Sequence, residues 1–288
     1  MKEPEFLQNS EYGKFTKEIL DFFVPLSLQL PKLREDPSSM TIIVKAVGAS
    51  GIQDVVTEAD KFMQQRLKEK VARVHPDWQF WGEEGEDNIS TFDSSKSFLF
   101  ITDPIEGTNN FRAGRDDDWG SVVSLVDVKK GEPIIGIVAH PATKTFYVGV
   151  KGQGAYILRY NEENQIVSVN PMNNKPEDER FTYNDSPHFS PELSAIVERF
   201  LSLGEVSRQT FIDPESGALE VVRNRGTIYF KTSNEMAAVF VILKEIGGIV
   251  TDADGKPWHL GINSLISARN QEDYEYLKSL SDKARGVK

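Results

Sequence analysis

The sequence contains no cysteine among its 288 residues. Disulfide bonds, thiolate metal sites and a cysteine nucleophile are therefore excluded, and the composition fits a reducing compartment, for which we expect the cytoplasm. Long apolar runs are also missing, because the candidate FFVPLSLQL is too short to span a bilayer and contains Pro25. The start, MKEPEFLQNSEYG, lacks the basic-then-apolar pattern of a secretory signal. We therefore expect no membrane partner.

Basic residues are fewer than acidic residues in this sequence. The chain has 33 lysines and arginines against 44 aspartates and glutamates, a formal net charge of −11. A surface of this sign repels phosphate backbones, so we expect no nucleic acid polymer as a partner. A small phosphorylated substrate would need local positive charge at its site, and a bound divalent cation supplies that charge most simply.

The N-terminal third of the chain has helical periodicity. The segment YGKFTKEILDFF is amphipathic, and Pro25 and Pro31 are expected to end its helix. A second helix is predicted from Glu58 to about Arg73, because apolar residues recur on one face. Its N-cap is Thr57, with Asp60 at the capping-box position, and on its own this is a sufficient explanation for that aspartate.

From about position 98 to 158 the pattern changes to strands. SVVSLVDV, EPIIGIVAH and KTFYVGV are short, β-branched and separated by turn residues, which predicts an antiparallel sheet. After the polar segment YNEENQ, predicted helices (PELSAIVERFLSL, NEMAAVFVILKEIGG, EDYEYLKSL) alternate with the strands GTIYF and GIVT. We therefore predict an α+β lobe over 1–160, with most of the metal ligands, and an α/β lobe over 161–288.

Acidic residues stand at three junctions between predicted elements. Glu83 lies in the loop WGEEG, Asp103 and Glu106 follow the apolar strand FLFI, and Glu235 begins a helix. Strand ends and helix starts hold side chains rigidly, as a metal-ligand cluster requires. Each signal alone has an ordinary explanation, since DPIEGT is rich in turn formers, GEEG suits a solvated loop, and acids favour the first turn of a helix.

The stretch from Asp103 to Thr108 combines several groups that suit a metal and a phosphate. Pro104 favours an extended backbone at Asp103, so its carboxylate continues the strand direction. The carbonyl of Ile105 is a further oxygen ligand, and Gly107 lets a ligand approach the main chain. Thr108 can open a helix whose free N–H groups bind phosphate, while its hydroxyl holds a water. Mg²⁺ prefers about six oxygen ligands and leaves several positions to water and phosphate, so the stretch predicts a magnesium site.

The order of these segments resembles the inositol monophosphatase family, within the superfamily that includes fructose-1,6-bisphosphatases and 3′(2′),5′-bisphosphate nucleotidases. The matching segments are Lys45 followed by DVVTEAD, then WGEEG, ITDPIEGTNNF and SNEMAAVFVILKEIGGIVTDADG. The resemblance covers nearly the whole chain. It implies a layered αβαβα sandwich, α+β and α/β in class, and Mg²⁺-dependent, typically lithium-sensitive hydrolysis of a phosphomonoester. Family members are commonly dimers, so a homodimer is expected.

The resemblance also implies roles for individual residues. It assigns Glu83, Asp103 and the carbonyl of Ile105 to a first metal, and Asp103, Glu106 and Glu235 to a second. Two or three Mg²⁺ ions are implied, with Mn²⁺ as a substitute.

Catalysis and substrate binding are assigned by the same resemblance. Thr108, hydrogen-bonded to Asp60, would act with Glu83 to orient and deprotonate the attacking water. The amides of Gly107 and Thr108 would hold the phosphate, and Glu235 would contribute to the substrate site.

Two motifs depart from the family pattern. The family normally has aspartate where this chain has Glu106, and Trp-Asp where it has Asn234 and Glu235. Each extra methylene moves a carboxylate by ~1.5 Å, and a misplacement of ~1 Å can cost on the order of 10²-fold in rate. Two matched extensions can also compensate one another, so we favour a working phosphatase, acting on a small phosphorylated polyol or sugar, with a higher Mg²⁺ requirement. A bisphosphate nucleotidase, a fructose-1,6-bisphosphatase and a degenerate phosphate-binding member remain alternatives.

Overall fold

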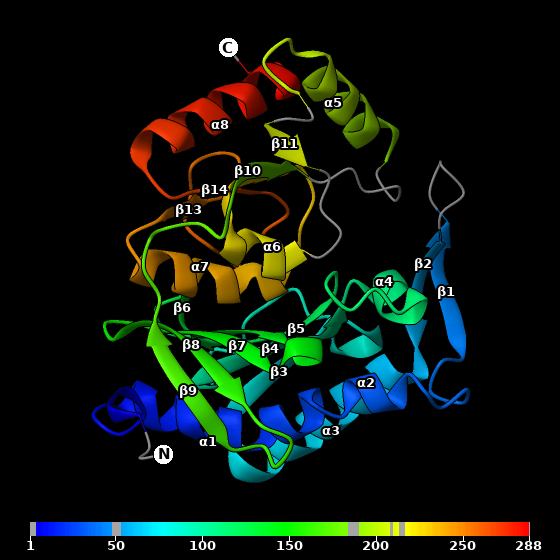
Figure 1. Cartoon of the computed structure of the whole chain (residues 1–288), viewed down its shortest axis with the longest axis vertical. Helices are drawn as coiled ribbons and strands as arrows, with labels where there is room; N and C mark the ends of the chain where they lie inside the picture. Colours follow the sequence, from blue (N-terminus) through cyan, green and yellow to red (C-terminus); the bar gives the residue numbers. More distant parts are fainter. Residues whose placement is uncertain (1–3, 48–52, 184–189, 208–209, 213–216, 288) are drawn as a thin grey trace.

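The computed structural model describes residues 4–47, 53–183, 190–207, 210–212 and 217–287. Two β-sheets alternate with three layers of helices, so the order through the molecule is helix, sheet, helix, sheet, helix (Figure 1). This is the predicted αβαβα sandwich. Among the described residues, no helix combines the length and the apolar character that crossing a membrane demands.

The large sheet has seven strands, in the order β3-β4-β5-β6-β7-β8-β9. The predicted antiparallel pairing is confirmed from β4 onward, whereas β3 runs parallel to β4. The strands are β3 (Trp78–Gly82), β4 (Phe98–Glu106), β5 (Gly120–Asp127), β6 (Glu132–His140), β7 (Thr145–Val150), β8 (Gly154–Tyr160) and β9 (Ile166–Pro171).

The outer face of the large sheet is covered by α1 (Glu11–Ser27), α2 (Leu30–Leu33) and α3 (Glu58–Val74) (Figure 1). The helix predicted from Glu58 is confirmed. The prediction that Pro25 ends the first helix is wrong, because α1 continues to Ser27 with Pro25 in its last turn. Pro25 lacks the N–H that would bond to the Asp21 carbonyl, and the helix continues past this one missing bond for two residues. Pro31 lies in the first turn of α2, where a missing N–H is tolerated.

The small sheet has five strands, in the order β11-β10-β12-β14-β13. Its strands are β10 (Asp178–Tyr183), β11 (Phe211–Ile212), β12 (Asn224–Tyr229), β13 (Ile249–Thr251) and β14 (Leu265–Ala268). Helices α5 (Pro191–Ser202) and α8 (Gln271–Arg285) cover its outer face. The alternation of helices and strands predicted for this half of the chain is therefore present.

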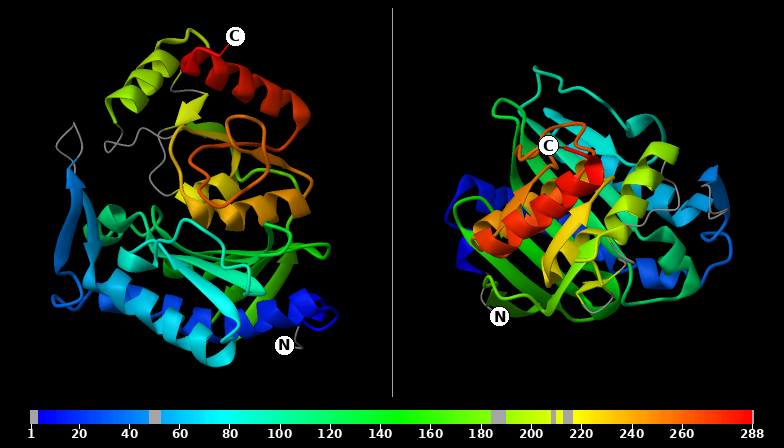
Figure 2. Two further views of the ribbon diagram at one scale, coloured as in Figure 1. Left: turned by 180° about the vertical axis from the view of Figure 1, so that it is seen from behind. Right: turned by 90° about the horizontal axis from the view of Figure 1, so that it is seen from above.

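The two sheets share a middle layer made of α6 (Gly217–Arg223) and α7 (Ala237–Glu245) (Figure 2). Helix α7 packs against β6 and β7 at glycines, since a Cβ on Gly136 would lie 2.2 Å from the carbonyl oxygen of Ala238. This close approach fixes the start of α7 against the large sheet, on the side where β4 ends.

The large sheet extends beyond position 160, where we predicted a boundary between lobes. Strand β9 pairs with β8, and the polar residues between them form a hairpin turn in which the Asn161 N–H donates to the Gln165 carbonyl at 3.0 Å. The polar composition that indicated a linker thus belongs to a turn inside the sheet, and the chain first enters the small sheet at Asp178.

A separate two-stranded hairpin, β1 (Ile42–Val47) and β2 (Gln53–Thr57), stands beside α4 (Thr108–Ala113) (Figure 1). Strand β2 leads directly into α3. The hairpin therefore joins the outer helical layer to the edge of the large sheet at which β4 and α4 meet.

Candidate active site

Strand β4 carries two of the predicted metal ligands at its end. Asp103 pairs with Val122 and Glu106 with Gly120, so β4 has one extra residue opposite β5 at this point. Pro104 lies in this bulge, where its lack of an N–H breaks no regular ladder bond. Asp103 is 5% and Glu106 9% exposed, and the Ile105 N–H donates to the Asp103 carboxylate at 3.1 Å. The strand therefore holds both carboxylates as buried groups on a rigid element.

The turn after β4 requires glycine and begins a helix. Gly107 has φ 83°, a left-handed conformation that residues with a Cβ rarely adopt, and it is the N-cap of α4. Thr108 is the first residue of α4, and its Oγ1 lies 3.0 Å from the Ile105 carbonyl oxygen and 3.3 Å from Asp60 Oδ1. The structure thus brings Thr108 and Asp60 together, as the resemblance implies.

Asp60 comes from a distant segment, the first turn of α3. Its carboxylate accepts hydrogen bonds from the backbone N–H of Thr57 at 2.8 Å and from the Thr57 hydroxyl, and both bonds of the capping box are present. Burial raises the pKa of Asp60 to about 6, against the lowering effect of the Thr57 hydrogen bonds. The capping explanation and the site explanation are both correct, because one carboxylate oxygen caps α3 while the other faces Thr108.

Glu83 lies directly after β3, one strand away from Asp103. The prediction of WGEEG as a loop is correct only from Glu83 onward, because Trp81 and Gly82 end β3. The ammonium of Lys45 lies 3.0 Å from Glu83 and 3.1 Å from Glu84. Glu84 is more deeply buried, and burial together with the neighbouring charge of Glu83 raises its pKa to about 7.

Glu106 is held by the start of α6. The Ala218 N–H donates to its carboxylate at 2.7 Å, and a Cβ on Gly217 would lie only 2.0 Å from the other carboxylate oxygen. Burial and the charge of Glu235 raise the pKa of Glu106 to about 8, although the Ala218 hydrogen bond opposes this. The longer side chain thus fills a space that only glycine at 217 leaves open.

Glu235 lies in the short 3₁₀ turn, Asn234–Met236, that leads into α7. It is 7% exposed, and its carboxylate accepts a hydrogen bond from the Ser233 hydroxyl. Burial, followed by the charge of Glu83, raises the pKa of Glu235 to about 7. Its position at a helix start agrees with the sequence prediction.

These five acids, Asp60, Glu83, Asp103, Glu106 and Glu235, form one cluster, which we call the acidic site. The pKa of Asp103 is raised well above its usual range, first by burial and then by Glu83, Glu106 and Glu235. The contacts agree: the Glu83 N–H donates to the Thr102 carbonyl at 3.2 Å, Thr108 lies 3.3 Å from Asp60, and the turn that carries Glu235 contacts β4. The structure thus brings together segments that lie 175 positions apart in the chain (60 to 235).

The chemistry of the acidic site fits a hard divalent cation. Its donors are carboxylate oxygens and a backbone carbonyl, which Mg²⁺ prefers, and such a cation would offset the repulsion that raises the pKa values. In the described part of the chain, however, no three acidic or histidine side chains already form a metal cage. Glu83, Glu106 and Glu235 each turn to a donor within the protein, namely Lys45, Ala218 and Ser233. Binding two metals would require these carboxylates to turn.

Three contacts of the acidic site were not predicted. Lys45 belongs to one of the matching motifs without a predicted role, and neither the amide of Ala218 nor the hydroxyl of Ser233 was predicted as a contact. The pair Ser216-Gly217 ahead of a helical segment was the one available signal for a close approach at α6. Every residue except proline has a backbone N–H, so the sequence does not indicate that the N–H of Ala218 binds Glu106.

Comparisons with known proteins agree on one family. The inositol monophosphatase family profile matches residues 30–285. A protein of Thermotoga maritima named fructose-1,6-bisphosphatase/inositol-1-monophosphatase is 30% identical over 214 residues, 72% of this chain and 75% of its own. A protein of the same name from Aquifex aeolicus is 26% identical over 243 residues, 81% of this chain and 84% of its own. The crystal structure of extragenic suppressor protein SuhB from Bartonella henselae, 22% identical, superposes with a TM-score of 0.72 over 94% of this chain and 99% of that one, which supports the fold alone.

The layered fold, the acidic site and these matches define a phosphoric monoester hydrolase. Within that class, the chain belongs to the inositol monophosphatase family, whose profile covers most of its length.

Proposed function

We propose that this chain hydrolyses the phosphomonoester of a small polyol or sugar, with Mg²⁺ as cofactor and Mn²⁺ as a substitute. The observation that carries the proposal is the convergence of buried carboxylates from α3, β4 and the turn before α7, whose pKa values are raised by burial and by neighbouring negative charge. Buried negative charge without equal positive charge is costly, so its presence favours a site for cations.

The proposed metal ligands are two acids and a backbone carbonyl at the end of β4, together with one acid after β3 and one before α7. Glu83, Asp103 and the Ile105 carbonyl would hold a first ion, and Asp103, Glu106 and Glu235 a second, with room for a third. When bound, the ions supply Lewis-acid activation of a water and neutralise phosphate charge.

The proposed roles of the remaining residues follow from their positions. Thr108 would orient the attacking water by its hydroxyl, and Asp60 would hold that hydroxyl in place from the start of α3. Glu83, the most exposed of these acids with 31% of its side chain accessible, would accept the proton. The amides of Gly107 and Thr108 would bind the phosphate, and Glu235 would face the substrate as well as the metal.

A titration of Mg²⁺ and Mn²⁺ with p-nitrophenyl phosphate and inositol 1-phosphate tests the proposal. We expect metal-dependent turnover that falls by about 10² or more in Asp103→Asn and Thr108→Ala. The matched control is Asp93→Asn, an exposed acid outside the acidic site, which should retain wild-type activity. Absence of turnover at every metal concentration contradicts the proposal.

A fructose-1,6-bisphosphatase activity is the second candidate. The observation in its favour is that the two relatives described above carry a name that joins both activities. Comparing rates on inositol 1-phosphate, fructose 1,6-bisphosphate and 3′-phosphoadenosine 5′-phosphate distinguishes these activities from that of a bisphosphate nucleotidase.

A degenerate member that binds phosphate without turnover is the remaining alternative. Its basis is the engagement of Glu106 and Glu235 by donors within the protein. Calorimetry that shows ligand binding without phosphate release would support it over the enzyme. Lithium sensitivity, a homodimer and a cytoplasmic location belong to the main proposal as predictions from the resemblance and the composition.

A further inference from the structure

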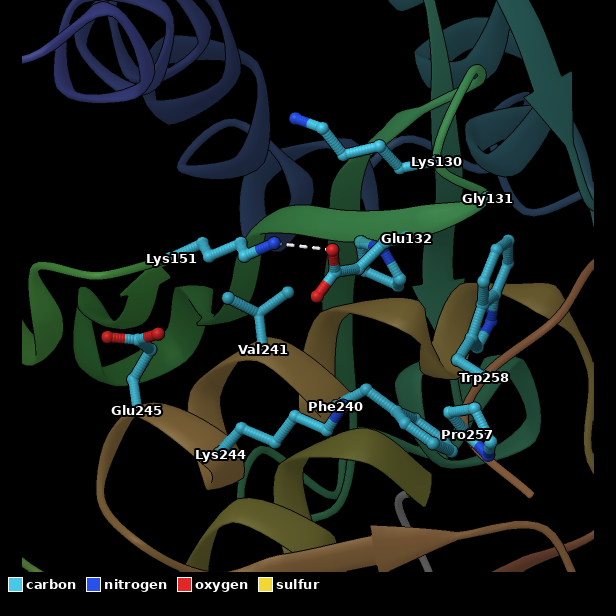
Figure 3. A pocket seen from close by; sticks show the side chains of 11 residues that line it. Lys130, Gly131, Glu132, Lys151, Phe240, Val241, Lys244, Glu245, Pro257 and Trp258 are labelled. Atoms are coloured by element: carbon cyan, nitrogen blue, oxygen red, sulfur yellow. Dashed lines mark hydrogen bonds and ion pairs between the residues drawn. The ribbon is translucent and has the colours of Figure 1, made fainter.

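A pocket of about 450 Å³ lies along the second half of α7. It is bounded by the turn between β5 and β6, by the end of β7, by the last turns of α7 and by the segment Pro257–Trp258. Figure 3 shows Phe240, Pro257 and Trp258 gathered at one end of the pocket, with Lys151 and Glu132 toward the other. Pockets of this size hold small ligands.

The apolar end of the pocket has an aromatic floor. Phe240 is 1% and Trp258 3% exposed, so both rings are fixed by packing and only a small part of each borders the pocket. Aromatic rings also pair edge to face, so the small part of each fixed ring that borders the pocket favours an aromatic ligand over a flexible one.

One cation of the pocket is available to a ligand. Lys151 is paired with Glu132, and Lys130 with Asp127 at 2.8 Å. Lys244 lines the same pocket, is exposed, and has no carboxylate or hydrogen-bond partner for its ammonium in the described part of the chain. An ammonium free to pair with a ligand is notable in a chain with a net charge of −11.

The remaining acid of the pocket, Glu245, is engaged by backbone donors and is not paired with Lys244. The Glu245 carboxylate accepts hydrogen bonds from the N–H groups of Gly152 and Gly154, both at 2.8 Å. These donors hold it against the turn after β7 and stabilise its charge.

The pocket is also connected to the acidic site. The Trp258 indole N–H donates to the carbonyl of Asn234 at 3.3 Å, and the Asn234 side chain accepts from the Gly261 N–H at 2.7 Å. Glu235 is the next residue along the chain. A ligand that shifts Trp258 therefore acts on the turn that positions Glu235.

We propose that this pocket binds a small planar anion, an aromatic ring with a single acidic group, which contacts the parts of Phe240 and Trp258 that border the pocket and pairs with Lys244. Its binding changes the affinity of the acidic site for divalent cations through Trp258 and Asn234. The second statement rests on the proposed function, whereas the first is independent of it.

The binding statement is tested by calorimetry on the full chain in Mg²⁺ buffer, with naphthalene-2-sulfonate as the probe. We expect saturable binding that weakens about fivefold in Lys244→Gln, the size expected for one partly exposed ion pair. The matched control is Lys129→Gln, the neighbouring exposed lysine that does not line the pocket, which should bind as wild type. Inorganic sulfate and neutral naphthalene-2-sulfonamide should both bind more weakly than the probe.

Three outcomes would overturn the site. They are no saturable binding to the wild type, equal binding by Lys244→Gln, and equal binding by sulfate alone. None of these readouts depends on turnover, so an inactive protein would contradict the proposed function and leave this test intact.

The connection is tested by the affinity for Mn²⁺, measured from the electron paramagnetic resonance signal of the free ion. We expect the probe to shift the Mn²⁺ dissociation constant of the wild type by about threefold or more, a coupling of modest size. Trp258→Phe keeps an aromatic ring at this position and removes the indole N–H. This variant should still bind the probe, but the probe should no longer shift its Mn²⁺ dissociation constant. An unchanged Mn²⁺ affinity in the wild type, or an equal shift in Trp258→Phe, would overturn the connection.

Discussion

The extra methylene of Glu106 carries its carboxylate to the amide of Ala218, 2.7 Å away, across the gap between β4 and α6. The extra methylene of Glu235 is matched by a hydrogen bond from Ser233 within its own turn. The charge of Glu235 also acts on Glu106, because after burial it is the largest cause of the raised Glu106 pKa. The two departures from the family pattern therefore lie in one interacting pair.

A double-mutant cycle tests whether the two lengths compensate. We expect Glu106→Asp and Glu235→Asp each to raise the Mg²⁺ concentration for half-maximal activity by about tenfold, because each shortens one side of a matched pair. In the double variant, the rise in the half-maximal Mg²⁺ concentration should be smaller than the two single effects combined. The difference should correspond to a coupling free energy of about 1 kcal/mol or more, as neighbouring residues commonly show. Strictly additive effects in metal titrations of the four proteins would contradict this pairing.

The space that Gly217 leaves for Glu106 gives a second prediction at the scale of one residue. In Gly217→Ala the new Cβ would overlap the Glu106 carboxylate, so this side chain must leave its present position. We expect the half-saturating Mg²⁺ concentration to rise by about an order of magnitude while the fold is kept.

Gly204→Ala is the matched control for Gly217→Ala, because a Cβ at 204 meets no atom within 4 Å. Metal titration and circular dichroism of both variants give the readout. Equal metal dependence in the two would show that the position of Glu106 is not set by the space at 217.

At the scale of elements, the N-terminus of α3 links helix stability to the site. The Thr57 hydroxyl oxygen caps the helix by accepting from the Asp60 backbone N–H, and the Asp60 carboxylate accepts from the Thr57 backbone N–H and hydroxyl. In Thr57→Ala we expect the unfolding free energy to fall by ~1 kcal/mol, which lowers the melting temperature by about 2–4 °C in a chain of this size. Activity should fall further than stability alone explains, because Asp60 loses a contact that fixes it beside Thr108.

Thr57→Ser keeps the hydroxyl and is the control for this prediction. Thermal unfolding and kcat should both return close to wild type in the serine variant. If alanine and serine at 57 give the same kcat, the capping box has no role in positioning Asp60.

Elements with a clear period were predictable from sequence. The helix from Glu58 was found with its cap because its signals are local, and β5, β6 and β7 were found because their apolar pattern and turns are regular. Strand β3 was missed, since its five residues, WQFWG, have no alternating pattern and are followed by two acids that resemble a loop. The end of α1 was predicted at Pro25, whereas one missing hydrogen bond does not end a helix whose last turn is buried at Val24 and Ser27.

The sequence predicts which acids form the acidic site, but it does not predict the contacts that hold their carboxylates. Its acids stand at junctions and in an order that resembles a family, which is information contained in the sequence. The contacts that hold them are made by a backbone amide, a small hydroxyl and a lysine from a separate hairpin. These depend on how β4, α6 and the β1–β2 hairpin pack, and long-range packing of this kind leaves no local pattern.

At the scale of the whole molecule, the layers are continuous where we predicted two lobes. The buried side chains between the large sheet and α7 include residues of β4, β5, α6 and β13, so the middle helical layer joins both sheets. The acidic site lies where this layer meets the end of β4. We therefore propose that both halves of the chain are required for the site to form, because Glu106 and Glu235 belong to different halves.

The accumulated negative charge of the acidic site makes the stability of the metal-free protein depend on pH. Burial raises the pKa of Glu106 from an ordinary 4.5 to about 8, and the pKa of Glu235 from 4.5 to about 7. The folded state therefore holds protons that the unfolded state releases, so stability is greatest below pH 4.5 for these groups and is lost as pH rises toward 8. We expect the melting temperature in EDTA to fall from about pH 5 to about pH 8. Saturating Mg²⁺ should reduce this fall, because a cation replaces the protons.

Thermal unfolding in EDTA and in Mg²⁺, followed across this range for three proteins, measures the effect. Glu106→Gln removes the carboxyl whose pKa rises to about 8, so its melting temperature should depend less on pH than that of the wild type. Glu163→Gln, an exposed acid in the turn between β8 and β9, should follow the wild type. A wild-type melting temperature that stays level or rises with pH in EDTA would mean that the carboxylates are ionised in the folded protein without mutual strain. That result would leave the acidic site without the electrostatic demand for a cation on which its proposed chemistry depends.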